Sequence, residues 1–130
     1  MSTTDDKALD VASFRASRAY EGFLKPPQPG DTFEARAAEH ARMFVGRGEP
    51  GASEIMQHLF DAAYLLKHDL VFIGSPETVV EKIRAAAGQG VFNVFMGEFN
   101  FSDLPEADLM RSIRLFGEQV IPALRSYEPF

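Results

Sequence analysis

The residues best suited to chemistry lie near the end of the chain, where Glu98 stands between an apolar run and two phenylalanines. The Glu98 carboxylate could carry a proton or hold a substrate amine at the mouth of a pocket. Phe99 and Phe101 could line that pocket. The same residue types also have plainer roles, as a solvated loop carboxylate and as rings that pack a loop onto the protein. The spacing alone leaves both interpretations open.

A second candidate is Ser75, which follows Gly74 and precedes Pro76. Serine accepts hydrogen bonds from the free N–H groups at a helix N-terminus. Proline suits the first helical position because its φ is already helical and it has no N–H to satisfy. Such an N-terminus can also bind a phosphate. Glu77, however, adds a negative charge to the first turn, which contains no Lys or Arg, so the pattern favours a structural cap.

The three histidines form no metal-binding motif. His58 and His68 are ten residues apart, too far to meet on one helical face, and His40 lies beyond an intervening loop. The chain has no cysteine, which excludes disulfides and a thiolate zinc site. The Gly-Ser-Pro corner also lacks the second glycine of a nucleophile elbow. We therefore expect neither a bound metal nor serine-hydrolase chemistry.

The elements that must position these residues follow a strand–helix–strand pattern. Residues 71–73 are β-branched or aromatic and uncharged, which is typical of a strand buried on both faces. A capped helix then runs from Pro76 to glycines at 88 and 90, and residues 91–96 form a second apolar run. The sequence thus predicts a βαβ unit.

Further helices are predicted on both sides of this unit. Apolar residues at helical spacing predict them over residues 9–23, 32–45, 53–66 and 104–125. In the last helix, Pro122 should introduce a bend or end the regular hydrogen-bond ladder. The core-facing positions expected there are Leu109, Ile113, Phe116, Val120 and Leu124. Residues 1–7 are predicted to be disordered, and the Pro-rich residues 26–30 to break the chain.

Composition narrows the class of protein. With 130 residues, 45% of them apolar and 25% charged, the chain is expected to form one soluble globular domain over residues 1–130. The net charge of -6, without a Lys/Arg cluster, argues against a nucleic-acid partner. No apolar run is long enough to span a membrane, and the polar start is unlike a signal peptide. We therefore predict a cytoplasmic protein.

Two parts of the chain together resemble the C-terminal end of the bacterial-luciferase-like flavin-dependent monooxygenases. Residues 73–79 read IGSPETV, and residues 112–125 read SIRLFGEQVIPALR. The resemblance is clearest from Gly74 to Arg125 and looser over residues 9–70. It implies an α/β fold made of the last two strand–helix units of a (β/α)8, or TIM, barrel, preceded by about three helices.

The resemblance also implies that a small organic substrate is oxidised by oxygen with reduced FMN, or with a deazaflavin. Active sites of such barrels lie at the C-terminal ends of the strands. The cofactor-binding or pocket-lining residues implied in this way are Gly74, Ser75, Met96, Gly97, Glu98 and Phe99. No catalytic residue is assigned.

A complete barrel needs about 250 residues. The early units, which in the family hold most of the flavin, have no counterpart in this chain, so we do not expect the isolated chain to be active. Two apolar strands would also leave N–H and C=O groups unpaired. We therefore expect a homo-oligomer, or a partner chain that supplies the missing strands. The alternatives are a non-catalytic oligomerisation or interaction module and a small α/β ligand-binding domain unrelated to flavin.

Overall fold

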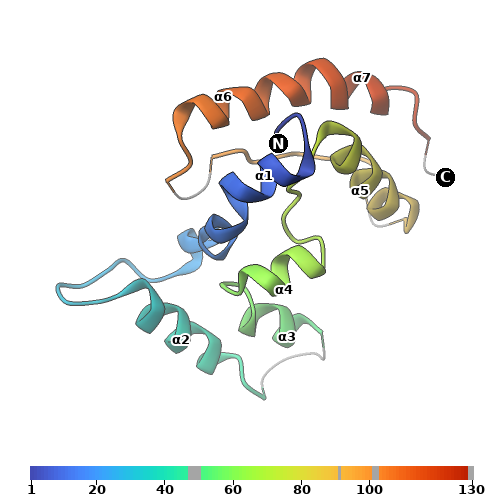
Figure 1. Cartoon of the computed structure of the whole chain (residues 1–130). Helices are drawn as coiled ribbons and strands as arrows, with labels where there is room; N and C mark the ends of the chain where they lie inside the picture. The colour runs from blue at the N-terminus through green and yellow to red at the C-terminus, as the bar shows by residue number, and fades with distance from the viewer. Residues whose placement is uncertain (47–50, 91, 101–102, 129–130) are drawn as a thin grey trace.

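A computed structural model describes residues 1–46, 51–90, 92–100 and 103–128, which form helices and connecting segments without a β-strand. Figure 1 shows their arrangement. The 3-10 helices are η1 and η2, and η3 is a turn of π-helix. In chain order the elements are α1 (Asp5–Ala12), η1 (Ser13–Arg18), η2 (Glu21–Phe23), α2 (Phe33–Met43), α3 (Ala52–Gln57), α4 (Ala62–Lys67), α5 (Pro76–Gly88), α6 (Glu106–Leu115), η3 (Phe116–Val120) and α7 (Ile121–Leu124).

The predicted α/β fold is wrong, and so are the two strand–helix units of a TIM barrel. Residues 71–73 and 92–96 lie outside helices, but no backbone hydrogen bond joins these two segments. The first residue of the second predicted strand, Val91, lies outside the described residues. The segments meet through side chains instead, because the rings of Phe72 and Phe95 stack with centroids 5.7 Å apart. Apolar character alone does not make a strand, which also needs a hydrogen-bonded neighbour.

Residues 71–73 are nevertheless packed from two sides, as their apolar character requires. Val71 and Ile73 pack against the alanines of α1 and η1, whereas Phe72 packs against the apolar face of α5 together with Val120. Successive side chains of an extended segment point in opposite directions. The segment therefore supplies both clusters of the core from between helices rather than from within a sheet.

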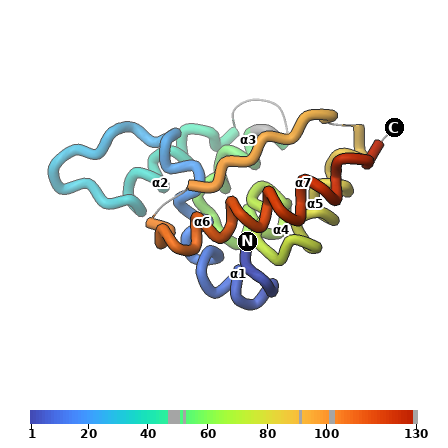
Figure 2. Tube along the Cα trace, turned by 90° about the horizontal axis from the view of Figure 1, so that it is seen from above, coloured from blue at the N-terminus to red at the C-terminus, as the bar shows by residue number. Residues whose placement is uncertain are grey.

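The last helical elements form one continuous rod. In Figure 1, α6, η3 and α7 run across the top, above α1 and α5, and α2, α3 and α4 form a lower group. Helix α5 packs against η3 and α7, and α4 packs against η1. Seen from above, the segment 92–100 runs alongside the rod (Figure 2), where its phenylalanines contact Phe116.

At Pro122 the regular α-helical hydrogen-bond ladder gives way to a π-helical turn. Proline cannot donate the regular helical hydrogen bond. In the preceding turn, the N–H of Ile121 bonds to the carbonyl of Phe116, five residues back, and the helix continues to Leu124. Because this turn changes the phase of the helix, one α-helical stripe cannot stay buried along the whole rod. The core position predicted for Ile113 is wrong, since this residue is 43% exposed.

The single helix predicted over residues 53–66 is in fact two helices. Helix α3 ends at Gln57, and α4 begins after Asp61, whose carboxylate accepts a hydrogen bond from the N–H of Tyr64 at 3.1 Å. Aspartate is a strong N-cap, so it starts a new helix. Ser53, the first residue of the predicted helix, lies within α3 and donates its hydroxyl to the carbonyl of Phe44. The helix expected over residues 9–23 likewise becomes α1 followed by the two 3-10 segments.

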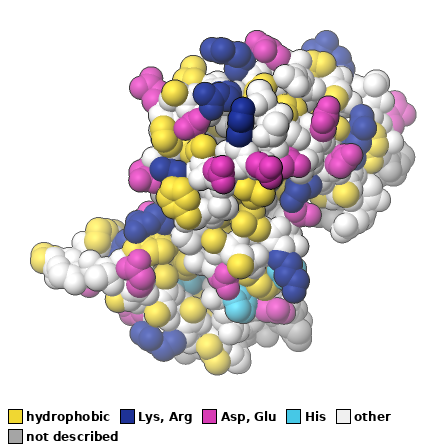
Figure 3. Space-filling view, in the orientation of Figure 1, with side chains coloured by type: hydrophobic (Ala, Val, Ile, Leu, Met, Phe, Trp, Pro, Cys, Tyr) yellow, Lys and Arg dark blue, Asp and Glu magenta, His cyan; other side chains and the backbone are white. Residues whose placement is uncertain are grey.

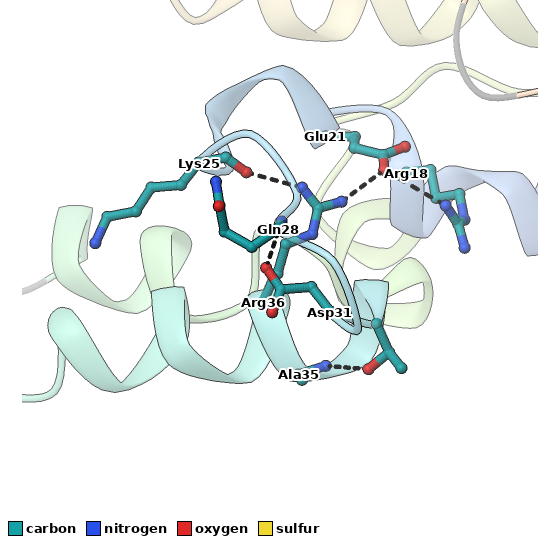
Figure 4. Close-up of polar contacts among 8 residues, drawn as sticks. Arg18, Glu21, Lys25, Gln28, Asp31, Ala35 and Arg36 are labelled. Atoms are coloured by element: carbon teal, nitrogen blue, oxygen red, sulfur yellow. Dashed lines mark hydrogen bonds and ion pairs between the residues drawn. The ribbon is translucent and has the colours of Figure 1, made fainter.

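Polar contacts surround the Pro-rich residues 26–30 (Figure 4). Arg36, on α2, donates to the carbonyl of Lys25 at 2.8 Å and forms an ion pair with Glu21 at 3.1 Å. Thr32 caps α2 with its side chain, so this helix begins where the sequence predicts. The side chain of Arg36 thus ties the segment that precedes the loop to α2, the helix that follows it.

Residues 1–7, for which the sequence predicts disorder, contact the body of the protein. Thr4 caps α1, and the N–H of Ser2 donates to the carbonyl of Gly74 at 3.3 Å. The amino group of Met1 lies 2.8 Å from the Ser112 hydroxyl oxygen. The start of α1 is thereby held against both α5 and α6.

The surface shown in Figure 3 intersperses Lys and Arg with Asp and Glu, and this face carries no basic stripe. Within the described ranges, no helix is both long and apolar enough to cross a membrane.

Candidate small-molecule site

An apolar cavity of about 360 Å³ opens where α1, the turn at Ala19 and Tyr20, the segments around residues 71–73 and 95–99, and α6 converge. Its aromatic lining consists of Tyr20, Phe72, Phe95, Phe99 and Phe116. Small-molecule sites typically measure about 300–1,000 Å³ and carry a few polar groups on apolar walls. The cavity therefore has the size and character of a site for a small organic molecule.

Four of the six pocket residues implied by the family resemblance lie in this lining, namely Met96, Gly97, Glu98 and Phe99. Gly74 and Ser75 are not among the lining residues. Met96 is 92% exposed and therefore contributes only at the rim. Phe101, the second aromatic candidate, lies outside the described residues.

Phe99 both lines the cavity and packs the loop against the protein. Its ring meets Phe116 edge-on with centroids 5.1 Å apart, and Phe95 lies 6.2 Å from the same ring. Such pairs add to the stability gained by burying the rings. The sequence places Phe95 and Phe116 in a core strand and a core helix, so their apolar spacing is visible, but their role as cavity walls is not.

Tyr20 is one of the polar lining residues that sequence reasoning missed, with Ser2, Asp69, Asp108 and Ser112. Its hydroxyl donates to the carbonyl of Leu70 at 2.6 Å. Burial raises the Tyr20 pKa, and the negative charge of Glu98 raises it further. The phenol therefore stays neutral at physiological pH. Nothing in the local sequence links Tyr20, on the predicted first helix, to a site built around Glu98.

Three carboxylates are among the described residues that line the cavity, and the charges of two of them are already neutralised. Asp69 pairs with Lys82, and Asp108 pairs with Arg111. Glu98 makes no ion pair within the part of the chain that the structure describes. It is therefore the carboxylate that is free to meet a bound ligand.

A polar groove adjoins the cavity and shares Glu98 with it. Two arginines line this groove, and both have partners: Arg15 pairs with Asp103 at 2.9 Å, and Arg18 pairs with Glu21 at 3.5 Å. Their charges are thus balanced by carboxylates other than Glu98.

The corner at Ser75 is a structural cap, as its sequence predicts. The Ser75 hydroxyl accepts a hydrogen bond from the N–H of Thr78 at 3.3 Å, and Pro76 occupies the first turn of α5. The Ser75 N–H donates to Asp5 at 2.6 Å, and the Thr78 hydroxyl donates to the other Asp5 oxygen at 2.9 Å. Asp5 thus occupies the place where a phosphate would bind. These hydrogen bonds hold the Asp5 pKa below its usual value.

The residues of the cavity do not fit the phosphate of a flavin cofactor. No Lys or Arg is among the described residues that line it, and its charged side chains are carboxylates. Phosphate recognition relies on cationic side chains or on free N–H groups at a helix N-terminus. The nearby N-terminus at Ser75 is filled by Asp5. No step of flavin chemistry is therefore assigned to these residues.

The histidines lie away from the cavity lining. His40 is buried against Phe44 and Phe60, whereas Tyr64 stacks between His58 and His68 with ring centroids 4.5 and 4.2 Å away. A search of the described residues finds no group of three His, Asp or Glu placed to hold a metal ion.

Comparisons of the chain with models of protein families, with curated proteins and with solved structures found no match. The resemblance to luciferase-like monooxygenases therefore rests on the motifs in residues 73–79 and 112–125.

Proposed function

We propose that the chain is the substrate-binding part of a luciferase-like flavin-dependent monooxygenase. Its cavity binds a small, largely apolar organic molecule that carries an amine. The observation that supports this function is the position of residues 96–99, implied as pocket residues by the resemblance, at the wall of an apolar cavity of about 360 Å³.

The preference for an amine follows from the charges around the cavity. Glu98 is the lining carboxylate without an ion pair in the described chain, and none of the described lining residues is a Lys or Arg that would attract an anion. A protonated amine near Glu98 would gain a charge-assisted hydrogen bond. The aromatic walls would bury the apolar part of the same molecule.

The flavin is assigned to another chain, because none of the described residues that line the cavity offers its phosphate a cationic group. In this proposal, reduced FMN or a deazaflavin and oxygen supply the oxidation, and the present chain holds and orients the substrate. The isolated chain is then inactive but still binds the substrate. We place this function in the cytoplasm, whose reducing conditions suit a chain without cysteine.

Calorimetric titration of the full chain with phenethylamine and with phenethyl alcohol tests the cavity. These two probes share an apolar body and differ in charge. We expect the amine to bind about tenfold more tightly, because its charge meets Glu98. Glu98→Gln should abolish that preference, whereas Glu77→Gln, on the exposed side of α5, should keep it. If neither probe binds, or both bind equally to the wild type, the proposal is wrong.

A separate fluorescence titration with FMN tests where the flavin is bound. We expect no change in FMN fluorescence at tens of micromolar chain, a range of weak affinity. Saturable FMN binding by the isolated chain would show that the flavin belongs to this chain and would overturn its assignment to another.

A further inference from the structure

The outward face of the α6–η3–α7 rod carries an apolar stripe that nothing in the described chain covers. Met110, Ile113 and Ile121 are 51%, 43% and 44% exposed. Gly117 lies between the two isoleucines and is also exposed. A Cβ atom added at Gly117 would meet nothing within 4 Å, so the glycine is not needed for packing inside the chain.

The π-helical turn brings the two isoleucines onto one face. In a regular α-helix, residues eight apart differ by about 80° around the axis. A π turn takes up one extra residue and so removes about 100° of that rotation. Because η3 lies between Ile113 and Ile121, their side chains fall close to one line. Gly117 sits within this turn, at the midpoint of the line.

Charged residues of opposite sign flank the stripe. Arg114 and Glu118 are both exposed and are four residues apart, so they lie on the same side of the rod. Neither side chain makes an ion pair or a hydrogen bond with another described residue. The face therefore offers an apolar centre, a gap at its middle and one unpaired charge of each sign.

We propose that this face is a self-complementary interface between two copies of the chain, in which the two rods pack antiparallel around a two-fold axis at Gly117. A two-fold axis places each residue before Gly117 opposite the residue equally far after it. Ile113 then meets Ile121 of the partner subunit, and the reverse contact forms on the other side of the axis.

The same axis pairs the flanking charges. Arg114 lies two residues, about 3 Å along the rods, from the position opposite Glu118 of the partner subunit, an offset that the two long side chains span, and the symmetry produces this ion pair twice. The missing side chain at Gly117 lets the two backbones approach closely where they cross. A glycine inside a helix costs about 1 kcal/mol relative to alanine. The interface gives this glycine a role that the single chain does not.

A second copy is the occupant that these features favour. An unrelated partner would need its own apolar stripe with a basic and an acidic residue in matching positions. The chain already presents such a surface to itself. This self-association does not use the unpaired strand edges that the sequence led us to expect. The interface also lies apart from the cavity, whose lining does not include Ile113, Gly117 or Ile121.

Sedimentation equilibrium of the full chain from about 1 to about 100 µM tests the interface. We expect a monomer–dimer equilibrium. Gly117→Gln should weaken dimerisation at least tenfold, because a side chain then fills the crossing point. The thermal unfolding midpoint of Gly117→Gln should not lie below that of the wild type when both are measured as monomers. The monomer has open space at this position. A strictly monomeric wild type over this range would overturn the proposal.

Charge reversal gives an independent test. Arg114→Glu and Glu118→Arg should each weaken the dimer about tenfold, since each places like charges together at two symmetric positions. The double variant should recover the wild-type dissociation constant. Lys67→Glu is the control, because it reverses a charge at an exposed residue of α4 rather than on the rod. It should change the dimer dissociation constant no more than the altered net charge of the chain does. A dimer that resists both single reversals, or is not rescued in the double variant, forms through another surface and contradicts the proposal.

Discussion

The backbone N–H of Ser75 donates to the carboxylate of Asp5 at 2.6 Å, although 70 residues separate the two. Asp5 also lies in the first turn of α1. Negative charge is favoured at the N-terminus of a helix, so this single carboxylate interacts favourably with the dipoles of both α1 and α5. The beginning of the chain is thereby joined to the corner that precedes the longest α-helix described.

The contribution of Asp5 to the stability of the folded chain should depend on pH. Its folded pKa lies below the ordinary 3.8, because the Ser75 N–H and then the Thr78 hydroxyl bond to its ionised form. The stability it provides is therefore fully present above 3.8 and is lost as pH falls through the lower folded pKa. Urea unfolding of Asp5→Asn should give a lower midpoint than wild type at pH 7, with the difference shrinking in acid. Asp10→Asn, an exposed change on the same helix, should show no comparable difference.

Gly74 should not tolerate a larger residue, because its neighbours approach closely. A Cβ atom there would lie 2.8 Å from the Thr78 Cγ2 and 2.9 Å from an Asp5 carboxylate oxygen. We expect Gly74→Ala to lower the free energy of unfolding by about 1–3 kcal/mol through overpacking. Adding Thr78→Ser removes the methyl group and should restore part of that loss. Gly22→Ala, where an added Cβ meets nothing within 4 Å, is the control. An equal loss at Gly22 would show that the cause is not this contact.

Substitutions of Ser75 can separate capping from charge. Ser75→Ala should lower the free energy of unfolding by about 1 kcal/mol, because the side-chain cap on the Thr78 N–H is lost. Aspartate caps most helices as well as serine does. Ser75→Asp should still destabilise here, since it places a second carboxylate beside Asp5. In the Asp5→Asn background, Ser75→Asp should be tolerated. Chemical denaturation of these variants at neutral pH measures the difference.

Protonation of His40 should lower the free energy of unfolding in mild acid. It is 6% exposed, and its Nδ1 has no hydrogen-bond partner in the described chain. Burial lowers its pKa from the ordinary 6.5, and a bond with the backbone of Met56 offsets this only in part. His40 therefore takes up a proton more readily in the unfolded chain than in the folded one. The stability that comes from neutral His40 is fully present above pH 6.5 and declines as the pH falls through the lower folded pKa.

The matched variant for this prediction is His40→Phe, which keeps an aromatic ring between Phe44 and Phe60. Urea midpoints measured between about pH 5 and pH 8 should decline in acid for wild type but much less for the variant. His68→Phe serves as a control, because His68 is the exposed end of the Tyr64 stack. Identical pH dependence in wild type and His40→Phe would contradict the assignment.

The sequence by itself determined the features that local hydrogen bonding decides. Ser75 caps α5, Pro76 begins it, and the glycine at 90, with a φ of 74°, follows its end. For α2 the sequence narrows the cap to Asp31 or Thr32, and the structure shows Thr32 in that role. A cap joins a side chain to a backbone N–H two or three residues away, so residue type and spacing are enough to predict it.

Only the tertiary structure decided what the apolar residues pack against. The period and composition of residues 71–73 indicate burial on two sides, and helices provide it as well as a sheet would. Strand pairing, the placement of Tyr20 beside Glu98, and the bond from Ser75 to Asp5 all join residues far apart in the chain. The exposure of Ile113 likewise depends on the phase change at the π turn. These contacts depend on the packing of the whole chain, so the spacing of residues within one segment does not predict them.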